Sequence, residues 1–132
     1  MEISKKSTQA FESACKQLGL EPVLPDVSKL RPDLGLYLTA HHMLAVIIEA
    51  EKDGEQFDIT NHDKRKYQPY HIADNGYVAG SSAGGFRFSD CGYDFGGRTY
   101  VGARLCSNSW DECEANAKNY PDLWEIITLI VK

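Results

Sequence analysis

PDLGLYLTAHHMLAVIIEAEK, residues 32–52, is the most strongly patterned stretch of the sequence and the one that decides the fold. Pro32 and Asp33 favour a helix start, because proline suits the first helical position and an early carboxylate complements the helix dipole. We therefore expect a helix from about Asp33 to Lys52, with Gly54 as its C-terminal stop. One helical face carries Leu36, Ala40, Met43, Leu44, Ile47 and Ala50.

Apolar residues extend around much of the same helix, which is typical of a core helix or of a membrane span. The additional apolar positions are Tyr37, Leu38, Ala45, Val46 and Ile48. His41 and His42 interrupt the run, and the stretch between Asp33 and Glu49 is shorter than the ~20 residues that a bilayer requires. We interpret it as a core helix and expect no membrane partner.

Helices are also expected towards both ends of the chain. Ser7-Thr8 can cap a first helix that ends at Gly19, and two prolines keep the following segment, residues 21–26, extended. Ser109-Trp110-Asp111-Glu112 is a capping box, which predicts a helix to about Lys118. Pro121 then interrupts or restarts this helix. The helical spacing continues to the C-terminus through Leu123, Ile126, Ile127 and Ile130.

The segment between these helices has a strand-like pattern. Phe57 and Ile59 form a fragment of period two, and residues 67–72 are aromatic with a proline, which indicates an edge strand or a bulge. Residues 76–97 contain seven glycines among aromatic residues, so we expect short strands joined by turns. The best strand is residues 99–106, where Thr99, Val101, Ala103 and Leu105 alternate with Tyr100, Arg104 and Cys106.

This order of elements, without βαβ alternation, predicts an α+β fold with a small antiparallel sheet packed against a buried central helix. We expect one domain over residues 1–132, with a loose tail over residues 1–6 and a glycine-rich strand and turn stretch over residues 76–98. The Leu36–Ala50 face should pack against the sheet that contains Val101, Ala103 and Leu105. Leu123, Ile126 and Ile127 should close the core, and Arg104 and Tyr100 should point to the opposite side.

Composition and charge exclude several classes of protein. The chain has 132 residues, of which 42% are hydrophobic and 25% charged, unlike a disordered tail, a collagen or a disulfide scaffold. The net charge of −5 argues against sequence-independent binding to a polyphosphate, which depends on lysine and arginine. Residues 62–106 nevertheless carry six basic and four acidic residues, whereas the rest of the chain carries eight basic and fifteen acidic ones.

The sequence marks no metal, cofactor or catalytic site. The cysteines, Cys15, Cys91, Cys106 and Cys113, contain no C-x-x-C pair, and no signal peptide precedes them, so we expect reduced core thiols in the cytoplasm. His41 and His42 point about 100° apart on a helix and lack a carboxylate at matching spacing. The glycine-rich residues 80–85 lack the lysine of a phosphate loop. We therefore expect no enzyme, although a deep pocket that gathers His41 or His42 with Glu49 and a cysteine would favour one.

One set of aromatic and basic residues is a candidate binding surface. Its members are Lys66, Tyr67, Tyr70, Arg87, Phe88, Arg98, Tyr100 and Arg104. Such side chains on a sheet can stack unpaired bases, form a hot spot for a protein partner, or simply make the polar rim of the sheet.

Several segments also resemble a family of small uncharacterised proteins encoded by Bacteroidetes phages and prophages. Residues 40–50 resemble the family's helix, and Lys66-Tyr67-Gln68-Pro69-Tyr70-His71 is similar to its aromatic Lys-Tyr-Tyr-Pro-Trp-Phe motif. Residues 101–106 are similar to its Val-Gly-Ser-Arg-Leu-Cys strand, and residues 114–124 to the helix that follows. Gln68 and His71 replace aromatic residues of the motif, the tryptophans before it are missing, and Pro121 interrupts the last helix. The resemblance implies a phage-related protein in the bacterial host cytoplasm and transfers no catalytic residue.

The sequence thus predicts a non-enzymatic accessory protein that acts on a protein partner. The alternative is an accessory protein that binds single-stranded nucleic acid through the aromatic and basic set. The sequence specifies neither the partner nor the oligomeric state.

Overall fold

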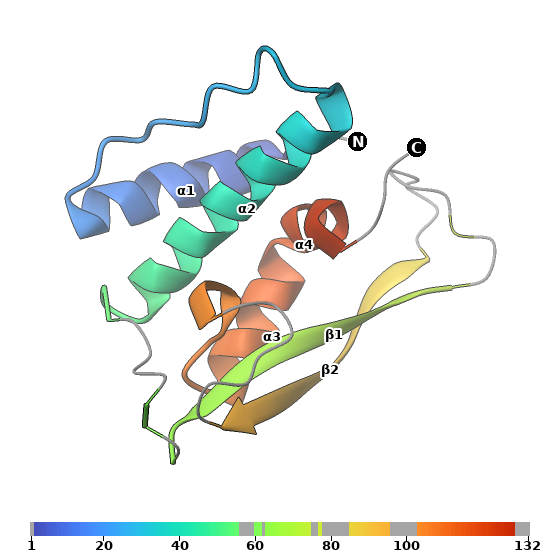
Figure 1. Cartoon of the computed structure of the whole chain (residues 1–132). Coiled ribbons are helices and arrows are strands. Elements are labelled where there is room, and N and C mark those ends of the chain that lie inside the picture. Colours follow the sequence, from blue (N-terminus) through green and yellow to red (C-terminus); the bar gives the residue numbers. More distant parts are fainter. Residues whose placement is uncertain are drawn as a thin grey trace.

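Three layers make up the fold in the computed structural model, which describes residues 2–55, 60–61, 63–74, 77, 85–95 and 103–128 (Figure 1). The elements are α1 (Lys5–Leu18), α2 (Pro32–Glu51), β1 (Arg65–Ala73), β2 (Phe86–Phe95), the 3₁₀ turn η1 (Ala103–Leu105), α3 (Trp110–Asn119) and α4 (Pro121–Thr128). Helices α1 and α2 pack together, α4 and η1 contact α2, and α3 lies on the sheet. The expected α+β class, with a small antiparallel sheet and helices at both ends, is confirmed.

Helix α2 is the centre of the core, as its sequence pattern predicts. Its expected face is buried except at Leu36, which is half-buried. The helix begins at Pro32 and its C-terminal cap is Lys52. Within the described residues, the core cluster consists of Phe11, Ala14, Cys15, Ala40, Met43, Leu44, Val46, Ile47, Ile48, Ala50, Leu105, Leu123, Trp124 and Ile126.

Helix α1 ends as expected at Gly19, whose φ of 70° is the left-handed conformation that glycine adopts readily, but it begins earlier than expected. The N-cap is Ser4, whose side chain accepts a hydrogen bond from the Ser7 amide. Ser7, in the first turn of α1, is buried, and its hydroxyl donates a hydrogen bond to the Asp122 carboxylate of α4 at 2.8 Å. The Ser4 amide binds the same carboxylate at 2.9 Å, so residues 4–6 belong to the packed fold, where a loose tail was expected.

Within the described residues, the sheet consists of β1 and β2, which pair antiparallel with Tyr67 opposite Tyr93 and Pro69 opposite Cys91. The proline-bearing segment is therefore a strand of a two-stranded sheet, consistent with the edge strand expected there. Strand β2 comes from the glycine-rich stretch, and its Gly92 lies under the Tyr70 ring, which would have to shift to make room for a Cβ at this position. Of residues 76–84, only Tyr77 is among the described residues, and Phe57 and Ile59 lie outside them.

The prediction of a strand over residues 99–106 is wrong for the part of this segment that the structure describes. Ala103–Leu105 is a 3₁₀ turn, and residues 99–102 lie outside the described residues. Leu105 and Cys106 are both fully buried, which a helical turn allows but an alternating strand with one solvent face does not. Leu105 does pack on α2 as expected, but from η1, whereas strands β1 and β2 contact α3.

The C-terminal helices follow the sequence signals closely. The Ser109 hydroxyl accepts from the Glu112 amide at 3.2 Å, and the Glu112 carboxylate accepts from the Asn108 amide at 3.3 Å. Tyr120 separates α3 from α4, which restarts at Pro121. Leu123 and Ile126 are buried in the core and Ile127 packs against it, as expected, while Ile130 lies outside the described residues. No helix in the described ranges is both long and apolar enough to cross a bilayer.

Candidate functional site

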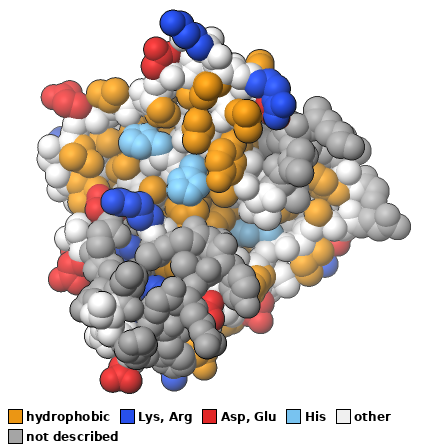
Figure 2. Space-filling model, in the orientation of Figure 1, with side chains coloured by type: hydrophobic (Ala, Val, Ile, Leu, Met, Phe, Trp, Pro, Cys, Tyr) orange, Lys and Arg blue, Asp and Glu red, His pale blue; other side chains and the backbone are white. Residues whose placement is uncertain are grey.

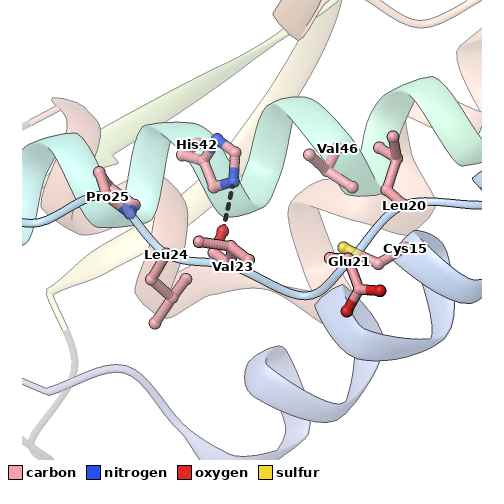
Figure 3. Close-up of a pocket in the computed structure, with 8 residues that line it drawn as sticks. All are labelled: Cys15, Leu20, Glu21, Val23, Leu24, Pro25, His42 and Val46. Carbon is pink, nitrogen blue, oxygen red and sulfur yellow. Dashed lines mark hydrogen bonds between the residues drawn. The ribbon is translucent and has the colours of Figure 1, made fainter.

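A groove runs between α2 and the extended segment that follows α1. It consists of two adjoining hollows of about 380 and 490 Å³, which share Leu20, Pro25, His42 and Val46 as walls. Cys15, Glu21, Val23 and Leu24 complete the first hollow, and Leu38, His41, Ala45, Glu49 and Arg104 complete the second. We call this feature the α2 groove; Figure 3 shows the residues of its first hollow.

Local sequence holds the outer wall of the α2 groove in place. Pro22 and Pro25 bias their predecessors towards extended backbone, so residues 20–25 cannot continue α1. The Nε2 atom of His42 donates a hydrogen bond to the Val23 carbonyl at 3.1 Å, which fastens this segment to α2 (Figure 3). The groove is therefore a built feature of the fold.

Large hydrophobic side chains are exposed around the α2 groove. Seven of the eleven exposed large hydrophobic residues found in the described ranges fall between residues 20 and 38, with 38% to 66% of their surface exposed. They are Leu20, Val23, Leu24, Leu30, Leu34, Tyr37 and Leu38, which we call the apolar patch. Figure 2 shows hydrophobic side chains gathered beside histidines over the region where Figure 1 places α2. Exposed apolar clusters of this kind mark interaction sites.

The α2 groove brings together the groups that would favour an enzyme, but without catalytic geometry. Cys15 and His42 line the first hollow, and His41, His42 and Glu49 line the second. Cys15 is buried, and burial followed by the Glu12 charge raises its thiol pKa, whereas a nucleophilic cysteine needs a lowered one. In the described part of the chain, no hydrogen bond joins Cys15 to His42. Burial also lowers the pKa of His41, so this imidazole is neutral near pH 7.

A metal site lacks support as well. Among the residues that the structure describes, no group of three or more His, Cys, Asp or Glu side chains could hold a metal ion. The groove therefore offers apolar contact surface and a few rim charges.

The aromatic and basic set predicted from sequence is spread over different environments. Lys66 is only 2% exposed, Tyr67 packs on Tyr93, and Phe88 lies under the Lys118 ammonium group. Arg98 and Tyr100 lie outside the described residues.

The remaining three members of the set are exposed, but they do not share one element or one surface. Tyr70 and Arg87 are on the sheet, where Arg87 forms an ion pair with Asp74 at 3.3 Å. Arg104 is exposed as expected, but it lines the α2 groove. The nucleic-acid interpretation of the set stays a prediction.

Sequence reasoning missed the residues of the apolar patch as a site. The available signal was the apolar surface of the 32–52 helix, which extends further around the cylinder than one core can bury. The core covers one side of α2 and leaves Leu34, Tyr37 and Leu38 in solvent.

A buried polar cluster lies on the other side of α2 and has a structural role. The Asn116 amide donates to the Ser107 hydroxyl at 2.8 Å and to Glu51 at 3.3 Å, and its oxygen accepts from the Trp124 indole at 3.2 Å. Burial, opposed in part by the Asn116 hydrogen bond, raises the pKa of Glu51 to about 7. These bonds join α2, α3 and α4 and the segment before α3.

No protein-family model, curated protein or solved structure matches the chain.

Proposed function

We propose that the protein is a non-enzymatic binding module that holds an amphipathic helix of a protein partner in the α2 groove. The observation that carries this proposal is the concentration of exposed large hydrophobic residues between Leu20 and Leu38. Helix-in-groove recognition uses apolar anchors spaced three or four residues apart, and such anchors fit a groove that lies along a helix.

The extent of the apolar patch favours a protein segment over a small molecule. Each hollow of the groove has the volume of a small-molecule site. However, Leu30, Leu34 and Tyr37 are exposed without lining either hollow, so a small ligand in the groove would leave them in water. A helix of several turns covers both the groove and these flanking residues.

Charge complementarity favours a basic partner. Glu21 and Glu49 line the groove, with Arg104 as the one basic residue among its lining side chains in the described ranges. A partner helix whose apolar face is flanked by lysine or arginine would therefore complement the two glutamates that line the groove.

The resemblance to proteins of Bacteroidetes phages and prophages supplies the biological setting of this proposal. In that setting the protein is a phage-related accessory factor in the host cytoplasm, and its partner is a host or phage protein.

Variant-dependent capture from a lysate of Bacteroidetes host cells tests the proposal. Leu38→Asp places a charge in the groove, and Ile72→Asp places one at a similarly exposed position on the sheet. The wild type and Ile72→Asp should retain the same partner, and Leu38→Asp should retain at least about tenfold less, which corresponds to a loss of ~1.4 kcal/mol. Equal retention by a folded Leu38→Asp variant, or loss caused only by Ile72→Asp, would rule out the groove as the binding site.

A further inference from the structure

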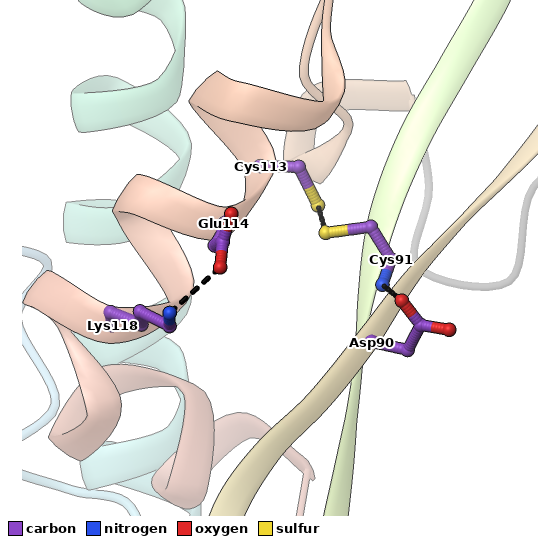
Figure 4. Close-up of polar contacts among 5 residues, drawn as sticks. All are labelled: Asp90, Cys91, Cys113, Glu114 and Lys118. Atoms are coloured by element: carbon purple, nitrogen blue, oxygen red, sulfur yellow. Dashed lines mark hydrogen bonds and ion pairs between the residues drawn. The ribbon is translucent and has the colours of Figure 1, made fainter.

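Two of the four cysteines face each other across the contact between the sheet and α3 (Figure 4). Cys91 lies on β2 and Cys113 on α3, and their sulfur atoms are 3.0 Å apart. A disulfide bond is about 2.05 Å long, so the two sulfurs need to approach by only about 1 Å to form one. Both residues are free thiols in this structure.

We propose that Cys91 and Cys113 form a reversible intramolecular disulfide that ties β2 to α3 when the protein meets a small disulfide oxidant such as oxidised glutathione. Cys91 is 6% exposed and Cys113 is fully buried, so Cys91 is the thiol that the oxidant reaches first. The Cys91 thiolate attacks oxidised glutathione, forms a mixed disulfide and releases one glutathione.

The Cys113 thiolate then attacks the Cys91 sulfur and releases the second glutathione. The protein loses two protons and two electrons, and the oxidant gains them as two glutathione thiols. The reaction is chemically balanced and needs no further reactant.

The surroundings of Cys91 and Cys113 should make formation of this disulfide slow. Burial raises the pKa of both thiols, and the Glu114 and Asp90 charges raise that of Cys91 further, while Lys118 opposes them. The thiolate is the reactive form, so oxidation waits for local opening of the interface.

The position of the pair also separates it from the proposed binding function. The bond would close a loop from residue 91 to residue 113 and so restrict the unfolded chain, which is how a disulfide stabilises a fold. Neither cysteine lines the α2 groove. Oxidation should therefore stabilise the protein and leave partner binding unchanged.

Thiol counting on the full chain tests the proposal. The reduced protein is equilibrated with oxidised glutathione and then unfolded in denaturant that contains N-ethylmaleimide, which alkylates every free thiol. Intact and peptide mass spectrometry then count and locate the alkylated cysteines. Alkylated thiols should fall from four to two per chain, with Cys15 and Cys106 alkylated and a cross-linked peptide pair that contains Cys91 and Cys113. Oxidation should raise the urea midpoint of the wild type and of Cys15→Ala, each compared with its own reduced form. The same treatment should leave the urea midpoint of Cys113→Ala unchanged.

The wild-type measurement decides the matter even where a variant folds poorly. Four alkylated thiols at equilibrium, a glutathione adduct that persists on Cys91, or a bond mapped to Cys106 would each overturn the proposal. Oxidation that abolishes partner capture would overturn the claimed independence from the groove.

Discussion

At the scale of single residues, two half-buried titratable groups, His71 and Glu51, have pKa values shifted in opposite directions. Burial lowers the pKa of His71 from 6.5 to about 4. The His71 ring stacks on Phe86, with the ring centroids 4.7 Å apart, and contacts the Trp124 ring. Its Nε2 atom has no hydrogen-bond partner within the described part of the chain. Burial raises the pKa of Glu51 from 4.5 to about 7. Neither pKa shift could be predicted from the sequence, because both depend on contacts between distant segments.

These two shifts make opposing contributions to stability between about pH 4.5 and 6.5. The folded state binds a proton at Glu51 more tightly than the unfolded state does, so this residue's contribution falls as pH rises from 4.5 to 7. The unfolded state binds a proton at His71 more tightly, so the His71 contribution falls as pH drops from 6.5 to 4.

Glu51→Gln should leave the His71 contribution to the pH dependence of stability unopposed. Glutamine keeps an oxygen acceptor for Asn116 but does not titrate. We expect the wild-type free energy of unfolding to change little between pH 6.5 and 4.5. In the variant it should fall by up to ~1.4 kcal/mol per pH unit over the same range, the limit for one proton. Urea unfolding at a series of pH values measures both profiles, and parallel profiles would contradict the assigned pKa of Glu51.

At the scale of elements, the helices could be predicted from sequence because their signals are local. Helix α2 has its spacing and its proline, and α3 has its capping box. The strand expected over residues 99–106 failed because alternation in a short apolar segment does not reveal that Leu105 and Cys106 are both buried. The α2 groove was not predictable either, since it depends on residues 20–25 lying back along α2.

The two sides of α2 should respond differently to truncation. Ile47 is buried in the core, so Ile47→Ala should lower the free energy of unfolding by about 2–5 kcal/mol through lost packing and a cavity. Leu38→Ala, on the exposed side, should lower it by no more than ~0.5 kcal/mol. Chemical denaturation compares the two variants, and a Leu38 cost equal to that of Ile47 would show that the patch is a covered structural face.

Arg104→Ala should resemble Leu38→Ala in its small effect on the free energy of unfolding, which the same chemical denaturation measures. Arg104 is exposed at the groove, so we expect a small change in stability from its removal.

At the scale of the whole molecule, the contacts that hold the fold together and the proposed binding surface lie in different parts of the structure. The sheet and α3 meet through buried contacts such as Cys91 with Cys113, and the core lies between α1, α2 and α4. The opposite surface of α2 keeps the apolar patch and the groove in solvent.

Photo-cross-linking from the α2 groove shows whether a partner helix binds there. A benzophenone amino acid replaces Leu38 in one variant and Ile72 on the sheet in a matched control, and each is irradiated in the lysate used for partner capture. We expect residue 38 to cross-link one protein, at apolar positions three or four residues apart in a helix flanked by lysine or arginine. A partner that cross-links from residue 72 and not from residue 38, or a cross-link from either position to nucleic acid in place of protein, would contradict it.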